Sequence, residues 1–80
     1  MKIRINTFAV LKEYFEHSFE IEVNDLNTIN DLKEELVKIK PQAQGLLNIC
    51  RFAVNNTFVN NKAVIYENDN IFVIPPSSGG

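Results

Sequence analysis

The sequence predicts a two-layer α+β domain in which a mixed sheet packs on one main helix. Near the N-terminus, apolar residues alternate with polar ones, as they do in half-buried strands. Between residues 29 and 39 the apolar spacing changes to three and four, which is typical of an amphipathic helix. The last apolar run, Ile71–Ile74, is apolar on both sides and therefore belongs in the middle of the sheet. A chain of 80 residues can form one small domain with a single core.

The N-terminal part of the chain predicts two antiparallel strands joined by a short link. Lys2–Thr7 and Phe19–Val23 both alternate with period two, and the second stretch has a solvated acidic face. Between them, Phe8–Phe15 has helix-like apolar spacing over a turn or two, which ends before His17. Because the link is short, we expect the two strands to pair with each other.

The main helix has recognisable start and stop signals. Thr28 stands where an N-cap belongs, and Asp31 follows three residues later in an aspartate variant of the capping box. Pro41 ends the helix. One apolar stripe is expected to face the sheet, formed by Ile29, Leu32, Leu36 and Ile39 and widened by Val37.

The second half of the chain predicts short strands and turns. Gln42–Asn48 is expected to form a short turn that covers one end of the core. The alternating residues of Cys50–Val54 predict a third strand, in which the Cys50 thiol would be buried and structural. Asn55-Asn56 is a hairpin turn, because asparagine tolerates positive φ, and Thr57–Val59 is its return arm. The first and last strands would be central neighbours, so the C-terminal residues would leave the middle of the sheet.

Composition argues against several classes of function. With a formal net charge of −2, the chain lacks the basic footprint of a nucleic-acid-binding protein. No apolar run approaches the roughly 20 residues of a membrane helix, and the start has no signal-peptide h-region. The single cysteine, Cys50, cannot form an intramolecular disulfide, which favours a reducing cytoplasm. We expect a soluble cytoplasmic domain whose partners are proteins, with no nucleic acid and no membrane.

The side chains offer no catalytic constellation and no metal site. His17 is the only histidine and reads as a solvated turn residue, while Cys50 falls within the strand pattern. Gly45 stands alone and makes no phosphate-binding loop. The chain is therefore expected to have no catalytic residues of its own.

The C-terminal segment is the one chemical handle that the sequence presents. We divide the chain into a folded domain, residues 1–74, and an extended tail, residues 75–80. Prolines end the strand, six extended residues reach at most about 20 Å, and glycines can pass a constriction that side chains would block. Three simpler explanations remain open: a disordered end, a remnant of a purification linker, or a tail that pairs locally. A carboxylate is a poor electrophile, so another enzyme would have to activate it, most simply as an acyl-adenylate.

Several of these features together resemble a known family. They are Val54-Asn55, the turn Glu67-Asn68-Asp69-Asn70, the strand Ile71–Ile74 and the ending Pro75-Pro76-Ser77-Ser78-Gly79-Gly80. They are similar to the small, sulfur-carrying subunit of molybdopterin synthase, and the resemblance covers essentially the whole chain. It implies the ubiquitin-like β-grasp fold, in agreement with the layout above.

The resemblance implies a function as well as a fold. An adenylating enzyme of the ubiquitin-activating type would use ATP to activate Gly80, which would then become a thiocarboxylate. No cofactor would be permanently bound. The sulfur would go to cyclic pyranopterin monophosphate in the active site of the large synthase subunit, within a heterotetramer. The tail residues that insert there would be Pro75, Pro76, Ser77, Ser78 and Gly79.

The resemblance also implies a partner-binding surface formed by Phe8, Phe58 and Ile74. Equally, these could be a core aromatic or scattered exposed hydrophobic residues. The chain departs from the family where Asn68-Asp69 replaces the usual Gly-Asp, and where Ser77-Ser78 replaces an apolar or small pair. Alternative functions are a sulfur carrier for thiazole synthesis, a ubiquitin-like protein modifier, or a plain interaction module without carrier chemistry.

Overall fold

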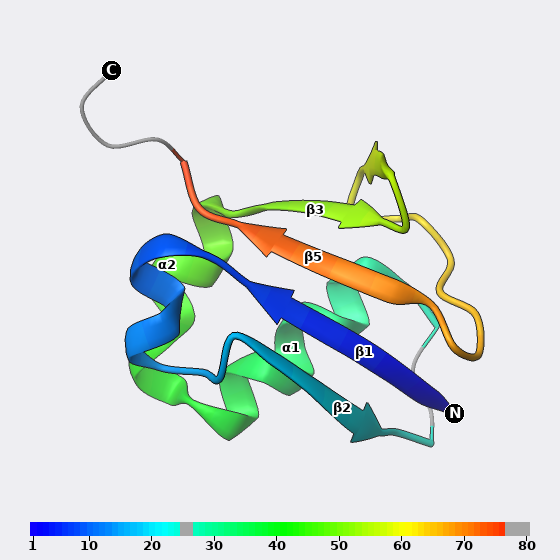
Figure 1. Cartoon of the computed structure of the whole chain (residues 1–80), viewed down its shortest axis with the longest axis horizontal. Helices are drawn as coiled ribbons and strands as arrows, with labels where there is room; N and C mark the ends of the chain where they lie inside the picture. Colours follow the sequence, from blue (N-terminus) through cyan, green and yellow to red (C-terminus); the bar gives the residue numbers. More distant parts are fainter. Residues whose placement is uncertain (25–26, 77–80) are drawn as a thin grey trace.

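The computed structural model describes residues 1–24 and 27–76, which form a five-stranded mixed sheet with the helices on one face (Figure 1). The strand order is β2-β1-β5-β3-β4, where β1 pairs with β5 in parallel and the other pairs are antiparallel. The strands are β1 (Lys2–Thr7), β2 (Ser18–Glu22), β3 (Arg51–Val54), β4 (Thr57–Val59) and β5 (Asn70–Ile74). The two-layer α+β prediction is confirmed, and the last strand is central beside β1.

The N-terminal strands pair as predicted. Their register runs from Lys2 opposite Glu22 to Asn6 opposite Ser18, so that β2 begins and ends one residue earlier than expected. The link contains η1 (Ala9–Glu13), a 3-10 helix. It begins with a positive φ of 54° at Ala9, a conformation that alanine rarely adopts.

Helix α1 (Ile29–Ile39) begins with the predicted capping box. Thr28 Oγ1 accepts the Asp31 N–H at 3.3 Å, and the Asp31 carboxylate accepts the N–H groups of Thr28 at 3.0 Å and Asn27 at 3.1 Å. Hydrogen bonds from the backbone of Thr28 and then Asn27 hold the pKa of the Asp31 carboxyl below its ordinary value. The prediction was wrong for Ile39, the last residue of the helix, which is 46% exposed, whereas Leu36 is buried.

The segment predicted as a short turn is helical instead. Pro41 starts η2 (Pro41–Ala43), which leads into α2 (Gln44–Ile49). Proline suits the first position of a helix, since its missing N–H would be unpaired there in any case. Ala43 and Leu47, four residues apart, are both fully buried, and this pair explains why the segment folds as a helix against the core.

Cys50 is not part of a strand. It caps the C-terminal end of α2 and is half-buried, while β3 starts at Arg51. Its thiol donates to the carbonyl oxygen of Leu46 at 3.2 Å. Burial raises the pKa of the Cys50 thiol to about 11, against a smaller opposing effect of Lys33. The thiol is therefore structural, as expected, but it is placed by a helix rather than by strand alternation.

Asparagine occupies two tight turns that require positive φ. Asn55, in the hairpin between β3 and β4, has φ of 57°, and Asn68, in the turn before β5, has φ of 68°. Asparagine is the non-glycine residue that adopts this conformation most readily. The replacement of glycine by Asn68 therefore leaves the turn intact.

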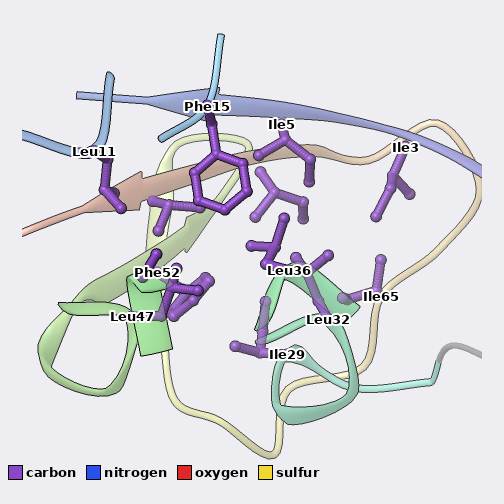
Figure 2. Close-up of a cluster of buried hydrophobic side chains, with 13 residues drawn as sticks. Ile3, Ile5, Leu11, Phe15, Ile29, Leu32, Leu36, Leu47, Phe52 and Ile65 are labelled. Carbon is purple, nitrogen blue, oxygen red and sulfur yellow. The ribbon is translucent and has the colours of Figure 1, made fainter. Parts of the chain in front are cut away.

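The core lies between the sheet and the helical layer (Figure 2). On β1 and β5, every second side chain points into it, and the alternate side chains occupy the opposite face. Its members are Ile3, Ile5, Leu11, Phe15, Ile29, Leu32, Leu36, Ala43, Leu47, Phe52, Ile65, Ile71 and Val73. This packing fixes the central strand from which the tail departs.

Candidate functional site

The tail begins at the end of the central strand. β5 ends at Ile74, which pairs with Arg51 of β3. Pro75 is buried and Pro76 is exposed, so the first proline still packs against the domain. β5 pairs with β1 as far as Val73 and with β3 as far as Ile74, so the strand that leads into the tail has a neighbour on each side. The predicted tail residues Ser77, Ser78, Gly79 and Gly80 lie outside the described residues.

An aromatic surface covers the part of the open sheet face next to this starting point. Its members are Phe8, Phe58, Phe72 and Ile74, with the small Ala53 between them. The rings of Phe8 and Phe72 stack, with centroids 6.1 Å apart and planes inclined by 17°. Phe72 pairs with Ala53 on β3, which in turn pairs with Phe58 on β4. Phe58 is 52% exposed, and the open face presents an apolar area that a partner could cover.

Polar side chains flank the aromatic surface on two sides. The guanidinium carbon of Arg51 lies 4.1 Å from the centre of the Phe58 ring, in a cation–π contact. On the other side, the His17 ring meets Phe8 edge to face, with centroids 5.6 Å apart. The Nδ1 of His17 donates to the carbonyl oxygen of Thr7 at 2.9 Å, which fixes the ring in this position.

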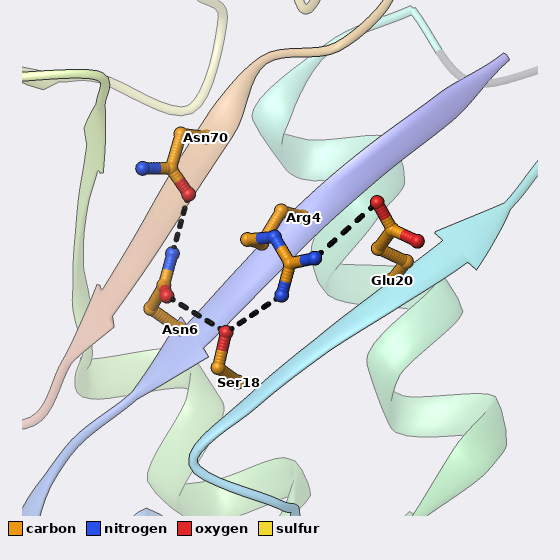
Figure 3. A network of polar contacts seen from close by, with 5 residues as sticks. All are labelled: Arg4, Asn6, Ser18, Glu20 and Asn70. Atoms are coloured by element: carbon orange, nitrogen blue, oxygen red, sulfur yellow. Dashed lines mark hydrogen bonds and ion pairs between the residues drawn. The ribbon is translucent and has the colours of Figure 1, made fainter.

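The neighbouring part of the open face carries polar side chains that contact one another (Figure 3). Arg4 pairs with Glu20 at 3.4 Å and donates to Ser18 Oγ at 3.0 Å. Ser18 donates to Asn6 at 3.2 Å, and Asn6 donates to Asn70 at 2.7 Å. This polar surface directly adjoins the aromatic one. The open face is thus divided into an apolar half beside the tail and a polar half away from it.

The structure brings Phe8, Phe58 and Ile74, which the sequence pointed to separately, onto one continuous face. That they bind a partner stays a prediction. Sequence reasoning missed Phe72, because the run Ile71–Ile74 was read as buried on both sides. Ile71 and Val73 are fully buried, whereas Phe72 is only half-buried. The missing signal was Asn70. It is polar and lies two residues before Phe72, on the same side of the strand, which indicates that this side of β5 is open.

Within the part of the chain that the structure describes, the possible metal ligands are dispersed. No three of the described His, Cys, Asp and Glu side chains are grouped so that they could hold a metal ion. His17 and Cys50 lie apart, the first on the link to β2 and the second at the end of α2. In residues 1–24 and 27–76, the helices are too short or too polar to traverse a bilayer.

Comparison with known proteins gives matches over the whole chain. A family model described as the ThiS family matches residues 5–80. The chain is 29% identical, over 85 aligned positions and the full length of both proteins, to a molybdopterin synthase sulfur carrier subunit of Chlamydomonas reinhardtii.

Solved structures share the fold. One chain of a complex between subunits 1 and 2 of the molybdopterin-converting factor of Helicobacter pylori matches with a TM-score of 0.71 at 25% identity, covering all of both chains. A putative molybdopterin converting factor subunit 1 from Pyrococcus furiosus has a TM-score of 0.83 at 22% identity, over 95% of this chain and 98% of that one. A small archaeal modifier protein 1 of Haloferax volcanii has a TM-score of 0.82 at 16% identity, over the same shares of the two chains. The predicted β-grasp fold is confirmed.

Proposed function

This chain belongs to the ThiS family, and from that premise we propose that it is the sulfur-carrier subunit of a molybdopterin synthase. The observation that carries the proposal is the full-length similarity to a molybdopterin synthase sulfur carrier subunit. The match to the family model extends to residue 80 and so includes the Gly-Gly ending. The division of the open face supports the proposal, since the aromatic surface lies where the tail leaves the domain.

The chemistry of a carrier requires a partner that activates its carboxylate. An adenylating enzyme of the ubiquitin-activating type would join the Gly80 carboxylate to the AMP portion of ATP and release pyrophosphate. A sulfur donor would then displace AMP and leave a C-terminal thiocarboxylate. This chain contributes the reactive group and its delivery, while its partner supplies the catalytic groups. That division of labour fits a described surface without a catalytic constellation.

The second partner would be the large subunit of the synthase. The Helicobacter pylori match is a complex of subunits 1 and 2, which supports a pairing of this kind. We assign the aromatic surface, Phe8, Phe58, Phe72 and Ile74, to docking on that subunit. Docking there would place Pro76 and the following residues at the active site, where the thiocarboxylate sulfur would go to cyclic pyranopterin monophosphate. We place the reaction in the cytoplasm, where a lone thiol such as that of Cys50 stays reduced.

The protein-modifier alternative has weaker support. The similarity to the archaeal modifier protein is at 16% identity and shows the fold alone. A carrier for thiazole synthesis would share the activation step and differ in its partner. Pull-down separates the three functions. The molybdopterin carrier should capture a large synthase subunit, the protein modifier should give isopeptide-linked adducts, and the thiazole carrier should capture a thiazole synthase.

Mass spectrometry of the intact protein tests the proposal. The chain is incubated with ATP, the adenylating enzyme and a sulfur donor, and its mass is expected to rise by that of one oxygen-to-sulfur exchange. A chain that ends in an amide at Gly80 is the matched control, since it differs only in the reactive carboxylate. Equal cofactor production by the amide and the acid would refute the carrier mechanism.

A further inference from the structure

An open recess of about 610 Å³ lies beside the aromatic surface, between β3, β4 and the segment that follows β4. It shares Phe58 with that surface, so a partner that covers Phe58 also covers the recess. A hydrogen bond holds the turn after β4 that forms one side of the recess: Asn60 Oδ1 accepts the backbone N–H of Lys62 at 2.8 Å. The residues that line it are Arg51, Phe58, Val59, Asn60, Lys62 and Ala63.

Both ionisable groups in the recess are basic, although the whole chain is acidic. Arg51 and Lys62 line it, whereas the formal net charge of the chain is −2. The ion pairs among the described residues join Met1 to Glu67, Arg4 to Glu20 and Lys38 to Glu35, and neither recess residue takes part. The recess is therefore a local positive site without a carboxylate partner among residues 1–24 and 27–76.

Arg51 is held in place before any partner arrives. Its guanidinium carbon lies over the Phe58 ring, 4.1 Å from the ring centre, and its backbone is paired with Ile74, the last residue of β5. A guanidinium has donors in a planar fork that matches the two oxygens of a carboxylate. Among residues 1–24 and 27–76 none of the ion pairs uses that fork, so its donors are available for hydrogen bonds.

We propose that this recess receives an aspartate or glutamate side chain of the large synthase subunit, bound by Arg51 and assisted by Lys62. The inference rests on the proposed function, because it names a feature of that partner. The ion pair would fix the orientation of the partner on the aromatic surface. The guanidinium on the opposite half of the open face, that of Arg4, is already paired with Glu20. Contact with the aromatic surface would supply most of the affinity. The charge pair would fix how the partner is positioned and would raise the association rate.

Affinity measurements with single charge changes test the inference. The variants are Arg51→Gln, Arg51→Lys and Lys62→Gln, with Lys38→Gln as the control, since it removes the same charge from an exposed site on α1. Binding to the large subunit is measured at low and high salt. Arg51→Gln is expected to raise the Kd at least about tenfold and to flatten its salt dependence. Arg51→Lys keeps the charge and should retain most of that salt dependence.

Zero-length crosslinking supplies a second readout. A carbodiimide joins a lysine amine to a carboxylate only where the two are in contact. In the complex with the wild-type chain, Lys62 should link to an acidic residue of the large subunit, and Arg51→Lys should add a link at position 51.

The outcomes separate the two proposals. If the wild-type chain binds while Arg51→Gln matches Lys38→Gln in Kd and salt dependence, the recess does not take a carboxylate and this inference is overturned. The proposed function would survive that result. If the wild-type chain does not bind a large subunit at all, the proposed function falls and the inference falls with it.

Discussion

Truncation of Phe58 is the sharpest test of the aromatic surface. An aromatic side chain buries about 150–250 Å² when fully covered, and 52% of Phe58 is exposed, so that about 100 Å² remains for a partner to cover. At about 25 cal/mol per Å², covering this area contributes about 2.5 kcal/mol to docking. Since each 1.4 kcal/mol changes an equilibrium constant about tenfold, Phe58→Ala should raise the Kd for the large subunit by about 60-fold.

The same substitution has a bounded effect on folding. The half of Phe58 that is already covered, in part by Arg51, corresponds to about 2.3 kcal/mol by the same measure. A small domain with about 5 kcal/mol or more of stability would remain folded after this loss. Urea unfolding of the variant checks this point independently of binding.

Tyr66→Ala is the matched control for Phe58→Ala. Tyr66 is also aromatic and is 66% exposed, but it lies before β5, at the opposite end of that strand from the tail. Isothermal titration calorimetry with the large subunit should therefore show an unchanged Kd for Tyr66→Ala. A folded Phe58→Ala chain whose Kd stays within about twofold of the wild type would refute the assignment of the aromatic surface to docking, since the expected loss of docking free energy is about 2.5 kcal/mol.

Three further predictions concern the domain itself. Backbone hydrogen bonds lower the pKa of Asp31 below 3.8, so its carboxylate stabilises the fold above that pH and ceases to do so as the pH falls through the folded-state pKa. Asp31→Asn should therefore lower the Tm at pH 7, and the difference in Tm between the two chains should narrow below pH 3.8. Because burial moves the pKa of Cys50 from 9.0 to about 11, iodoacetamide should alkylate the native thiol about a hundredfold more slowly at pH 8 than the urea-unfolded one. Ala9→Gly should raise the free energy of unfolding by up to about 1 kcal/mol, because glycine adopts the positive φ without strain.

Each of these predictions has a result that would contradict it. A Tm gap for Asp31→Asn that is the same at pH 3 and pH 7 would show that ionisation of the carboxyl is not what stabilises the helix start. Equal alkylation rates for native and unfolded chains would place Cys50 in solvent. For Ala9→Gly the control is Ala63→Gly, at a residue without positive φ, which should lose about 0.5 kcal/mol or more in chemical denaturation. A loss at both positions would argue against strain at Ala9.

Local signals were sufficient for most of the fold. Alternation at Ile3 and Ile5 located β1, and the Thr28–Asp31 capping box located the start of α1. The first is a pattern within one strand and the second is an interaction over three residues, so both can be recognised locally, and the structure contains both. The mixed sheet with a central last strand also followed, because only the middle of a sheet suits a run as apolar as Ile71–Ile74.

The errors arose where tertiary packing decides between local alternatives. Pro41 and Gly45 are turn signals, but the burial of Ala43 and Leu47 draws the segment into η2 and α2. Cys50 fitted a strand alternation that in fact starts one residue later.

Phe72 was misread for a related reason. Burial on both faces of a strand needs a covering layer on each side, and in the described chain the helices lie on one side only (Figure 1). The candidate surface could therefore be named only in part from the sequence. Its outline depends on cross-strand neighbours such as Ala53, which are distant along the chain.

The parallel pairing of β1 with β5 has a mechanical consequence. The amino end of β1 and the carboxyl end of β5 point to opposite edges of the sheet (Figure 1). Traction between Met1 and Pro76 would therefore load the hydrogen bonds between these strands in shear, all at once, instead of opening them one by one. A pull on Pro76 against the N-terminus is therefore resisted by several hydrogen bonds together.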